Sequence, residues 1–385
     1  MIIERTLQQA IRAFIGKYPI LAVTGPRQSG KTTMLRHLFS DYRYVSLENL
    51  DNRDFALNDP NGFFKQYDSH VIIDEIQQAP DLFSYMQTIV DEQKQMGQYI
   101  ISGSQNFMLM ERITQSLAGR IALFKLFPFD IEELSTSNLL SEDYLKTLIR
   151  GFYPAIYDRK IPSKQFYNNY LQTYVQRDVS SLLSIKDLRL FRNFIGLCAA
   201  RAGQLLNLND LAKDCGISQP TAKAWLSTLE SSYIVFLLHP YFENFSKRII
   251  KSPKLYFYDT GLLAFLQKFN HPEQLINHAA KGNLFENMII ADVVKKISHT
   301  DSTTEAWFWR DAAGHELDLL LVGDEGMRIC EIKTTQTIMS KMFKGLDYFE
   351  KISGKTKLNK TVIYAGDEDQ ERSNGSVFSW KRFTF

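Results

Sequence analysis

Cysteine is scarce in this 385-residue chain, which contains only Cys198, Cys215 and Cys330, far apart in the sequence. Their spacing fits neither a zinc site nor a disulfide framework, so we expect a protein of the reducing cytoplasm. Long hydrophobic runs are absent as well. No apolar stretch approaches the ~18 residues that a membrane-spanning helix needs, and we therefore expect no membrane partner.

An excess of one charge is also lacking. Lysine and arginine number 45 against 43 aspartates and glutamates, a formal net charge of +2. A protein that binds nucleic acid through its whole surface carries a large positive excess, so any contact with double-stranded DNA has to come from a local patch. The chain length indicates two or three domains.

The clearest positive signal is the segment 25–32, GPRQSGKT, which fits the phosphate-loop pattern GxxxxGK[ST] between a predicted strand (20–24) and a predicted helix. The glycines allow the tight curl that points successive N–H groups at an anion. Lys31 supplies a charge for the β- and γ-phosphates, and the Thr32 hydroxyl can ligate Mg²⁺. We therefore predict ATP and Mg²⁺ as ligands. The predicted nucleotide-binding residues are Gly25, Pro26, Arg27, Gln28, Ser29, Gly30, Lys31, Thr32 and Thr33.

A second strand supports the same site. The apolar run 70–73 ends in Asp74 and Glu75, the Walker B pattern. An acid at the carboxyl end of a buried parallel strand lies beside the phosphate loop. We assign Asp74 to Mg²⁺ and Glu75 to the polarisation of the attacking water. The alternative interpretation is an acidic helix cap after a core strand.

Two further polar positions are candidates for contact with the γ-phosphate. Strand 99–104 ends at Ser104, the first candidate, with Asn106 as the second; the alternative is an ordinary polar turn. Arg120 precedes the predicted strand 121–127, and a guanidinium there is a candidate sensor or arginine finger, acting within its own chain or on a neighbour. A surface salt bridge is the competing interpretation of Arg120.

These motifs, with the segments 102–104, 118–120 and 127–129, resemble the prokaryotic AAA-type ATPases in which the ATPase core precedes a conserved C-terminal region. Segments 151–154 and 174–179 extend the resemblance to the second half of the chain. The resemblance implies an enzyme that binds and hydrolyses ATP, and it implies little about the substrate.

The middle of the chain is expected to be helical to about residue 206, with Tyr167 and Tyr170 on a packed face. Residues 208–229 then give helix, glycine turn and helix, with Gly216 at the turn and Ser218 as the cap of the second helix. Strands 234–238 and 248–258 would form a wing. The residues expected to contact DNA are Gln219, Thr221 and Lys223 on the second helix and Lys247, Arg248, Lys251 and Lys254 on the wing. The alternative is a winged helix used for protein packing. Residues 58–62 are expected to form a turn.

The C-terminal part contains two predicted strands, 316–322 and 327–333, around the turn 323–326. A hairpin centred between residues 324 and 325 pairs Asp318 with Glu331 and Glu316 with Lys333. Because side chains alternate along a strand, these four share one face. The apolar residues Leu317, Leu319, Cys330 and Ile332 take the other face.

This pattern, with Glu286 near the start of a preceding helix and a helix and a strand after it, resembles the PD-(D/E)xK nucleases. The resemblance implies that Asp318 and Glu331 hold Mg²⁺, that Lys333 orients or activates water, and that Glu286 completes the metal shell. The alternatives are a charge cluster on a solvated sheet face and a nuclease fold without activity.

We therefore expect an α/β protein in three parts: a P-loop ATPase core with a parallel sheet (1–140), a helical and winged-helix part (141–275), and an endonuclease-like α/β domain (276–385). The leading hypothesis is a Mg²⁺-dependent ATPase that acts as a switch on DNA. The alternatives are an ATP-gated DNA nuclease and an ATPase whose C-terminal domains only bind protein partners. Candidate partners are ATP, double-stranded DNA and further copies of the chain in a homo-oligomer.

Overall fold

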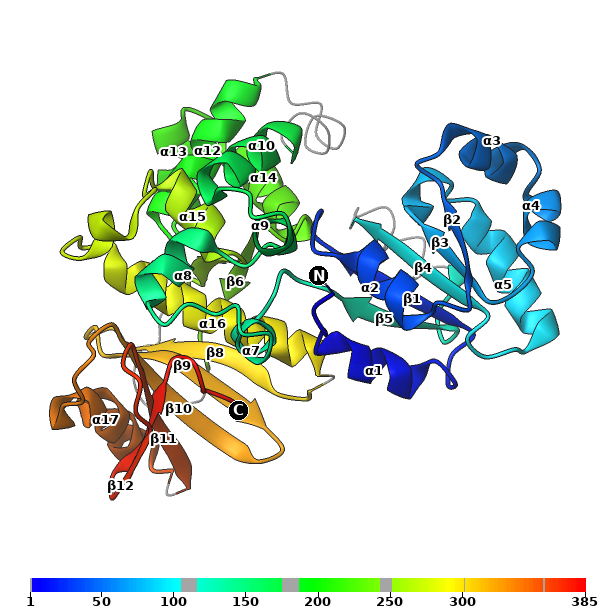
Figure 1. Cartoon of the computed structure of the whole chain (residues 1–385). Coiled ribbons are helices and arrows are strands. Elements are labelled where there is room, and N and C mark those ends of the chain that lie inside the picture. Colours follow the sequence, from blue (N-terminus) through cyan, green and yellow to red (C-terminus); the bar gives the residue numbers. More distant parts are fainter. Residues whose placement is uncertain (1, 105–115, 175–186, 243–250, 301, 356) are drawn as a thin grey trace. The chain divides into compact units, whose positions relative to one another are not determined.

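Figure 1 shows a computed structural model of the chain, which describes residues 2–104, 116–174, 187–242, 251–300, 302–355 and 357–385. The chain forms two compact units. The first comprises Met1–Phe129 with two later segments, Ser231–Tyr233 and Ser298–Asp301, and the second comprises Asp130–Glu230, Ile234–Ile297 and Ser302–Phe385. The division of the second unit into a middle and a C-terminal domain remains a prediction.

The first unit is built on a five-stranded sheet with the order β2-β3-β4-β1-β5, in which all neighbours run parallel (Figure 1). Its strands are β1 (Ile20–Gly25), β2 (Arg43–Ser46), β3 (Val71–Asp74), β4 (Tyr99–Ser104) and β5 (Ile121–Lys125). Helix α1 (Leu7–Phe14) precedes β1, and the strands are connected through α2 (Lys31–Leu38), α3 (Leu50–Asn58), α4 (Pro60–Gln66), η1 (Ile76–Gln78) and α5 (Leu82–Gln93). The predicted parallel-sheet core is confirmed.

Both faces of this sheet are buried, which explains why the residues of β1 before Thr24 are all apolar. Ile20 and Ala22 belong to a core with α3, α4 and α5, whereas Leu21 and Val23 belong to a second core with α1 and α2. A strand with helices on both faces has no solvated side. The strand therefore carries no polar residue before Thr24, close to its carboxyl end.

The turn predicted at 58–62 is wrong, because these residues join two helices. Asp59 is the residue between α3 and α4, and its carboxylate accepts a hydrogen bond from the Gly62 N–H at 2.9 Å. Pro60 is the first helical residue, a position where the missing N–H of proline has no cost. The same residue types serve turns and helix starts, and here they start α4.

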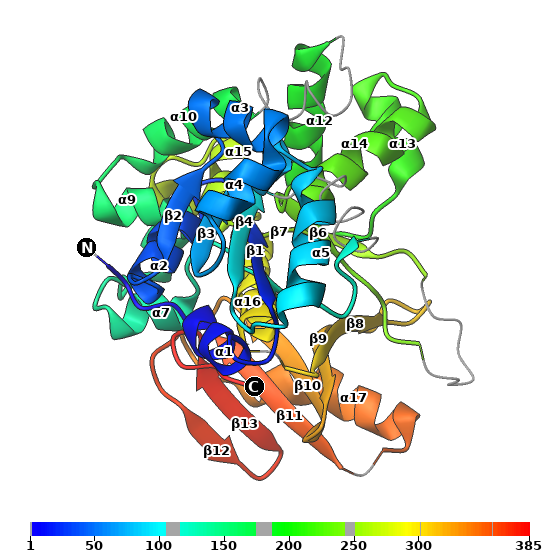
Figure 2. The ribbon, with the colours of Figure 1, turned by 90° about the vertical axis from the view of Figure 1, so that its right-hand side faces the viewer.

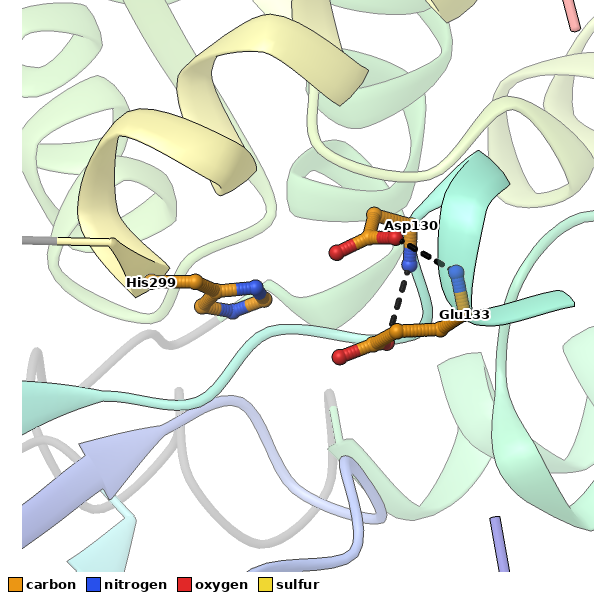
Figure 3. Close-up of side chains that lie close together, drawn as sticks. All are labelled: Asp130, Glu133 and His299. Carbon is orange, nitrogen blue, oxygen red and sulfur yellow. Dashed lines mark hydrogen bonds between the residues drawn. The ribbon is translucent and has the colours of Figure 1, made fainter. Parts of the chain in front are cut away.

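Within the residues that the structure describes, the second unit begins with a series of helical segments and a hairpin. They are α7 (Ile131–Thr136), α8 (Tyr144–Arg150), α9 (Pro154–Asp158), α10 (Ser163–Tyr174), α12 (Leu188–Ala200), α13 (Leu208–Cys215), α14 (Gln219–Ser231), the antiparallel pair β6 (Val235–Leu238) and β7 (Lys254–Phe257), and α15 (Thr260–Leu266). Helix α7 was not predicted from the sequence. Figure 3 shows its capping box, in which Asp130 accepts from the Glu133 N–H at 2.8 Å and Glu133 accepts from the Asp130 N–H at 3.1 Å.

The rest of the second unit is a six-stranded mixed sheet, order β12-β13-β11-β10-β9-β8, with α17 along one face (Figures 1 and 2). Its strands are β8 (Glu305–Arg310), β9 (Glu316–Gly323), β10 (Gly326–Lys333), β11 (Leu358–Tyr364), β12 (Gln370–Arg372) and β13 (Gly375–Ser379). Its helical segments are η3 (Pro272–Leu275), α16 (Lys281–His299), η4 (Ser340–Phe343) and α17 (Lys344–Ser353). None of the helices in the described part of the chain has the length and apolar character that a bilayer crossing requires.

Candidate nucleotide site and C-terminal carboxylate cluster

The phosphate loop lies between β1 and α2, as the sequence predicts. Gly25 has φ 145°, and a Cβ on it would lie 2.1 Å from the carbonyl oxygen of Leu126. Gly30, directly before α2, has φ 95°. Both positions thus require glycine, because a side chain would clash or strain the backbone. The loop takes its tight course because these two residues permit it.

Lys31, the first residue of α2, is buried with its side chain over the loop. Its Nζ donates to the carbonyl oxygens of Gly25 at 3.0 Å and Pro26 at 2.9 Å. The ammonium group is therefore at the loop that would surround a phosphate. A point charge at this place is what the loop needs to bind the β- and γ-phosphates.

Asp74, at the end of β3, lies where the Walker B assignment requires. Its Oδ2 accepts hydrogen bonds from Thr32 Oγ1 at 2.8 Å and from the Tyr44 hydroxyl at 2.9 Å, and its Oδ1 is bonded to Ser102. Burial, with Asp74 beside it, raises the pKa of Tyr44 to about 12, so Tyr44 stays a neutral donor. One hydroxyl and one carboxylate in contact at the loop are the oxygen ligands that Mg²⁺ prefers, and these residues fit the ion that the motif implies.

Glu75 and Ser104 are linked through Gln77. The Gln77 side-chain amide is bonded to the Glu75 carboxylate and lies 3.3 Å from Ser104 Oγ. Ser104 is the register partner of Gly25 in the neighbouring strand, which places it at the loop edge of the sheet. Glu75 has φ 57° and makes no side-chain capping bond to η1, so the helix-cap interpretation is not what the structure contains. Asn106, the second candidate beside Ser104, lies outside the described residues.

The prediction that Arg120 acts as a sensor within its own chain is wrong, because Arg120 lies at the opposite end of the sheet from the phosphate loop. It precedes β5, whose first residue Ile121 pairs with Ile20, whereas the phosphate loop follows Gly25 at the other end of β1. Five strand residues at about 3.3 Å each separate the two levels by roughly 16 Å. The guanidinium instead bonds to Asp91 at 2.6 and 2.8 Å. The salt-bridge interpretation of Arg120 is the one the structure supports.

Sequence reasoning missed Arg5, which supports the loop from below. Its guanidinium donates to the carbonyl oxygen of Ser29 at 3.0 Å and to that of Phe127 at 2.6 Å, and it lies 4.7 Å from the centre of the Phe129 ring. Arg5 is 4% exposed. No motif marks this arginine, since its two acceptors are backbone carbonyls far away in the sequence. No motif marks Tyr44 or Gln77 either, and their contacts with the side chains of Asp74, Glu75 and Ser104 become visible only in the fold.

Two late segments complete the first unit next to β1. The Tyr233 hydroxyl lies 3.2 Å from Thr24 Oγ1, and its ring packs edge-on against Phe127 at 5.3 Å. The Phe127 N–H donates to Nε2 of His299 at 3.3 Å. Thr24 directly precedes the loop, so residues far along the chain reach the strand that carries the nucleotide site. Nothing in the local sequence signals these contacts.

The predicted helix, glycine turn and helix are present as α13, Gly216 and α14. Gly216 has φ 73°, and Ser218 Oγ accepts from the Thr221 N–H at 3.2 Å. Gln219 and Lys223 are exposed in the first turns of α14, and Lys251 is exposed before β7. Lys247 and Arg248 lie outside the described residues. Lys254 is a correction: it is 2% exposed, inside the protein, and not on a surface that could meet DNA.

The C-terminal hairpin has the predicted register. Gly326 pairs with Gly323 and Cys330 with Leu319, which centres the hairpin between residues 324 and 325. The ladder ends there, one pair before Asp318 and Glu331, where the Asp318 carboxylate accepts a hydrogen bond from the Ile332 N–H at 2.7 Å. Beyond the end of the ladder, the side chains of Glu316 and Lys333 do not pair with each other as cross-strand pairing predicts.

The carboxylates named by the nuclease resemblance do gather in one cluster. Lys333 Nζ bonds to Glu331 and lies 3.4 Å from Asp318 Oδ2. The predicted partner of Lys333, Glu316, is instead bonded to Lys254 and, at 2.8 Å, to Arg310. Glu286, on α16, accepts from Lys254 Nζ at 3.0 Å and from the Tyr256 hydroxyl at 2.6 Å. The set that we call the carboxylate cluster is Glu286, Glu316, Asp318 and Glu331.

The cluster is largely buried, and its titration reflects that. Burial and the neighbouring Asp318 raise the pKa of Glu331 to about 7, against the lowering influence of Lys333. Burial raises the pKa of Glu286 as well, although Lys254 opposes the change. Burial alone would lower the pKa of Lys254, but Glu286, Glu316 and Asp318 raise it above the ordinary lysine value. Lys254 is therefore a buried cation.

Three family models match successive parts of the chain. Residues 17–135 match a model described as an AAA domain, residues 141–273 match a domain of unknown function (DUF8612), and residues 281–383 match a second domain of unknown function (DUF4143). The first match covers β1 to β5 with the phosphate loop and Asp74. This part of the first unit is thus similar in sequence to AAA domains.

Two curated relatives are 28% identical to this chain over 341 residues, covering 88% of it and 75% of each relative: uncharacterized proteins of Mycobacterium bovis and of Mycobacterium tuberculosis. Among solved structures, a Walker-type ATPase of Pyrococcus abyssi matches with a TM-score of 0.45 and 14% identity, covering 69% of this chain and 96% of that one. RuvB of Thermotoga maritima matches at 0.30 and 15%, covering 61% and 88%. These structural similarities are too low to support a function, so the functional argument below depends on the geometry of the nucleotide site.

Proposed function

We propose that this protein binds ATP together with Mg²⁺ and hydrolyses it in its first unit. The observation that carries the proposal is the contact of 2.8 Å between Thr32 Oγ1 and Asp74 Oδ2 beside a glycine-bounded loop. It joins the two halves of a P-loop site that are 42 residues apart in sequence. The AAA-domain match to residues 17–135 supports the same assignment.

The residues divide the work of the site. The loop N–H groups and Lys31 bind the phosphates, and Thr32 and Asp74 hold Mg²⁺, directly or through water. Bound Mg²⁺ would neutralise phosphate charge. Glu75 accepts the proton of the attacking water or orients it, and Gln77 keeps its carboxylate at the loop edge together with Ser104.

The test separates binding from hydrolysis. Lys31→Ala should lose tight ATP binding, measured by calorimetry with Mg²⁺, while Lys65→Ala, an exposed lysine of α4, should bind normally. Glu75→Gln should bind ATP and hydrolyse it at least tenfold more slowly, with Glu92→Gln as the matched control. Tight binding by a folded Lys31→Ala protein would contradict the proposal. Normal turnover by Glu75→Gln would remove Glu75 from its role.

We propose further that the ATPase acts on double-stranded DNA through α14. The supporting observation is the exposed first part of that helix, with Gln219 and Lys223, after a glycine turn. Since Lys254 is unavailable, few cations remain, and phosphate contacts dominate affinity. Weak, salt-sensitive binding is therefore expected.

Replacing Lys223 and Lys251 together with alanine should weaken binding at low salt and reduce the slope of log K against log salt by about 2. Lys213→Ala on α13 serves as the control. No binding of the wild-type protein at low salt would instead favour a protein partner for this part of the chain.

A further inference from the structure

Lys254 projects from β7 into the carboxylate cluster. Its side chain is 3% exposed, donates to Glu286 Oε1 at 3.0 Å and is bonded to Glu316. The lysine comes from a different element than the acids, which lie on α16 and β9. All four residues of β7 are buried, and the strand is paired with β6 along its length. The ammonium group cannot reach solvent unless β7 itself moves.

Each carboxylate of the cluster already has a donor within the chain. Glu286 accepts from Lys254 and from Tyr256, Glu316 from Lys254 and Arg310, and Asp318 from the Ile332 N–H. Glu331 is bonded to Lys333. Four carboxylates thus face three cationic side chains, leaving a formal charge of −1. Buried charges are stable only when paired and hydrogen-bonded in this way.

The metal ion that the nuclease resemblance implies does not fit this arrangement. Mg²⁺ requires several free oxygen ligands at about 2.1 Å and usually retains water. Here Oε1 of Glu286 and Oε1 of Glu316 bind the same ammonium group, and Oε2 of Glu316 binds Arg310. A divalent ion between Glu286 and Asp318 would therefore lie close to a buried positive charge. Two cations at such short range repel each other, and the lower effective dielectric of a largely buried site strengthens that repulsion.

We propose that Lys254 takes the place of a metal ion in this domain, so that the carboxylate cluster is a metal-free clasp fastening β7 to α16 and β9, and not a nuclease centre. The clasp ties together three segments that are separate in the sequence. Its charge remains fixed, because an ammonium group on a buried strand does not dissociate as a bound ion does.

A Mn²⁺ titration of the full-length protein without nucleotide tests the proposal, with free Mn²⁺ followed by electron paramagnetic resonance. The wild-type protein should bind the same amount of Mn²⁺ as the Asp318→Asn and Glu286→Gln variants. Lys254→Met should gain one Mn²⁺ site, and Asp318→Asn in that background should abolish it. Lys360→Met is the matched control, since Lys360 pairs with the partly exposed Asp347 and Glu350, and it should gain none.

Three results would overturn the proposal. The first is a Mn²⁺ site in the wild-type protein that Asp318→Asn removes. The second is wild-type cleavage of supercoiled DNA that the same substitution abolishes. The third is a folded Lys254→Met protein without a new site. If Lys254→Met does not fold, the wild-type titration and the Asp318→Asn comparison still decide the question. Mn²⁺ that remains bound in both acid variants belongs elsewhere and leaves the proposal supported.

Discussion

Single residues decide whether the nucleotide site can form, and Gly25 is the clearest case. Its φ of 145° and the closeness of the Leu126 carbonyl leave no room for a side chain. The loop follows β1, and β1 is the parallel neighbour of β5 in the sheet, so the loop starts close to the end of β5. The conformation and the close approach require glycine independently of each other.

Gly25→Ala should therefore lower the free energy of unfolding by about 1–3 kcal/mol and weaken ATP binding, because the end of β1 has to shift away from Leu126. Chemical denaturation and calorimetry measure the two effects. Gly16→Ala, where a Cβ meets nothing within 4 Å, is the control and should change neither. Unchanged ATP affinity in Gly25→Ala would show that the close approach does not shape the loop.

Glu331 gives the C-terminal part a dependence on pH. Its pKa is raised from the ordinary 4.5 to about 7, mainly by burial. Between these two values the folded state binds a proton that the unfolded state has lost, so the free energy of unfolding falls as pH rises from about 4.5 to about 7, by at most about 1.4 kcal/mol per unit. Below 4.5 both states are protonated, and the contribution is constant.

Glu331→Gln cannot titrate, so its stability relative to wild type should rise across this window and then level off above pH 7. Urea denaturation at a series of pH values measures the difference. Glu305→Gln, an exposed acid on β8, should run parallel to wild type. Parallel curves for Glu331→Gln too would mean that the carboxylate is ionised in the folded state throughout.

At the scale of elements, the strands of the first unit and the C-terminal hairpin are readable from sequence because each is an apolar run with a polar end or a two-residue turn. The hairpin register follows from counting alone. Lys254 shows where such reasoning stops. A lysine in a short strand is normally exposed, and only the folded chain brings it to Glu286, 32 residues later. A role of Arg120 within its own chain meets the same limit, since strand direction decides which end of the sheet faces the loop, whereas a role on a neighbouring chain stays a prediction.

The clasp between β7 and α16 should be a strong structural contact. Lys254→Met removes the cation that Glu286 and Glu316 share, although Glu316 keeps Arg310. Removing one partner of a buried ion pair typically costs about 3–5 kcal/mol. Lys360→Met breaks contacts with Asp347 and Glu350, whose side chains are 52% and 37% exposed, and should cost under about 1 kcal/mol. Denaturant unfolding compares them. A similar loss of unfolding free energy in both variants would show that Lys254 contributes no more to stability than a surface lysine.

At the scale of the whole molecule, the first unit is not a contiguous segment. The short segments Ser231–Tyr233 and Ser298–Asp301 belong to it, and Tyr233 and His299 contact Thr24 and Phe127. The expected boundary near residue 140 followed from motifs and composition, and the first and longest segment of the unit ends at Phe129. Motifs and composition do not predict that Ser231–Tyr233 and Ser298–Asp301, which we call the return segments, belong to the first unit. Their contacts with it depend on how the intervening chain folds.

A fragment ending at residue 140 should consequently be less stable than the same unit in the full chain. It would lack the ring that packs on Phe127 and the imidazole that accepts its N–H. We expect a lower thermal midpoint for the fragment by circular dichroism. In the full chain, Tyr233→Ala should move the midpoint in the same direction. A fragment as stable as the full chain's first unit would mean that the return segments contribute nothing.

These return segments also set the order of events during synthesis. The phosphate loop is complete once about 35 residues have been made, yet the unit that contains it acquires its last segment only with residue 301 of 385. Domains usually fold as units while the chain emerges from the ribosome. Here the unit with the nucleotide site gains its last stabilising contacts only after most of the protein has been made, so a truncated or stalled chain would contain a less stable first unit.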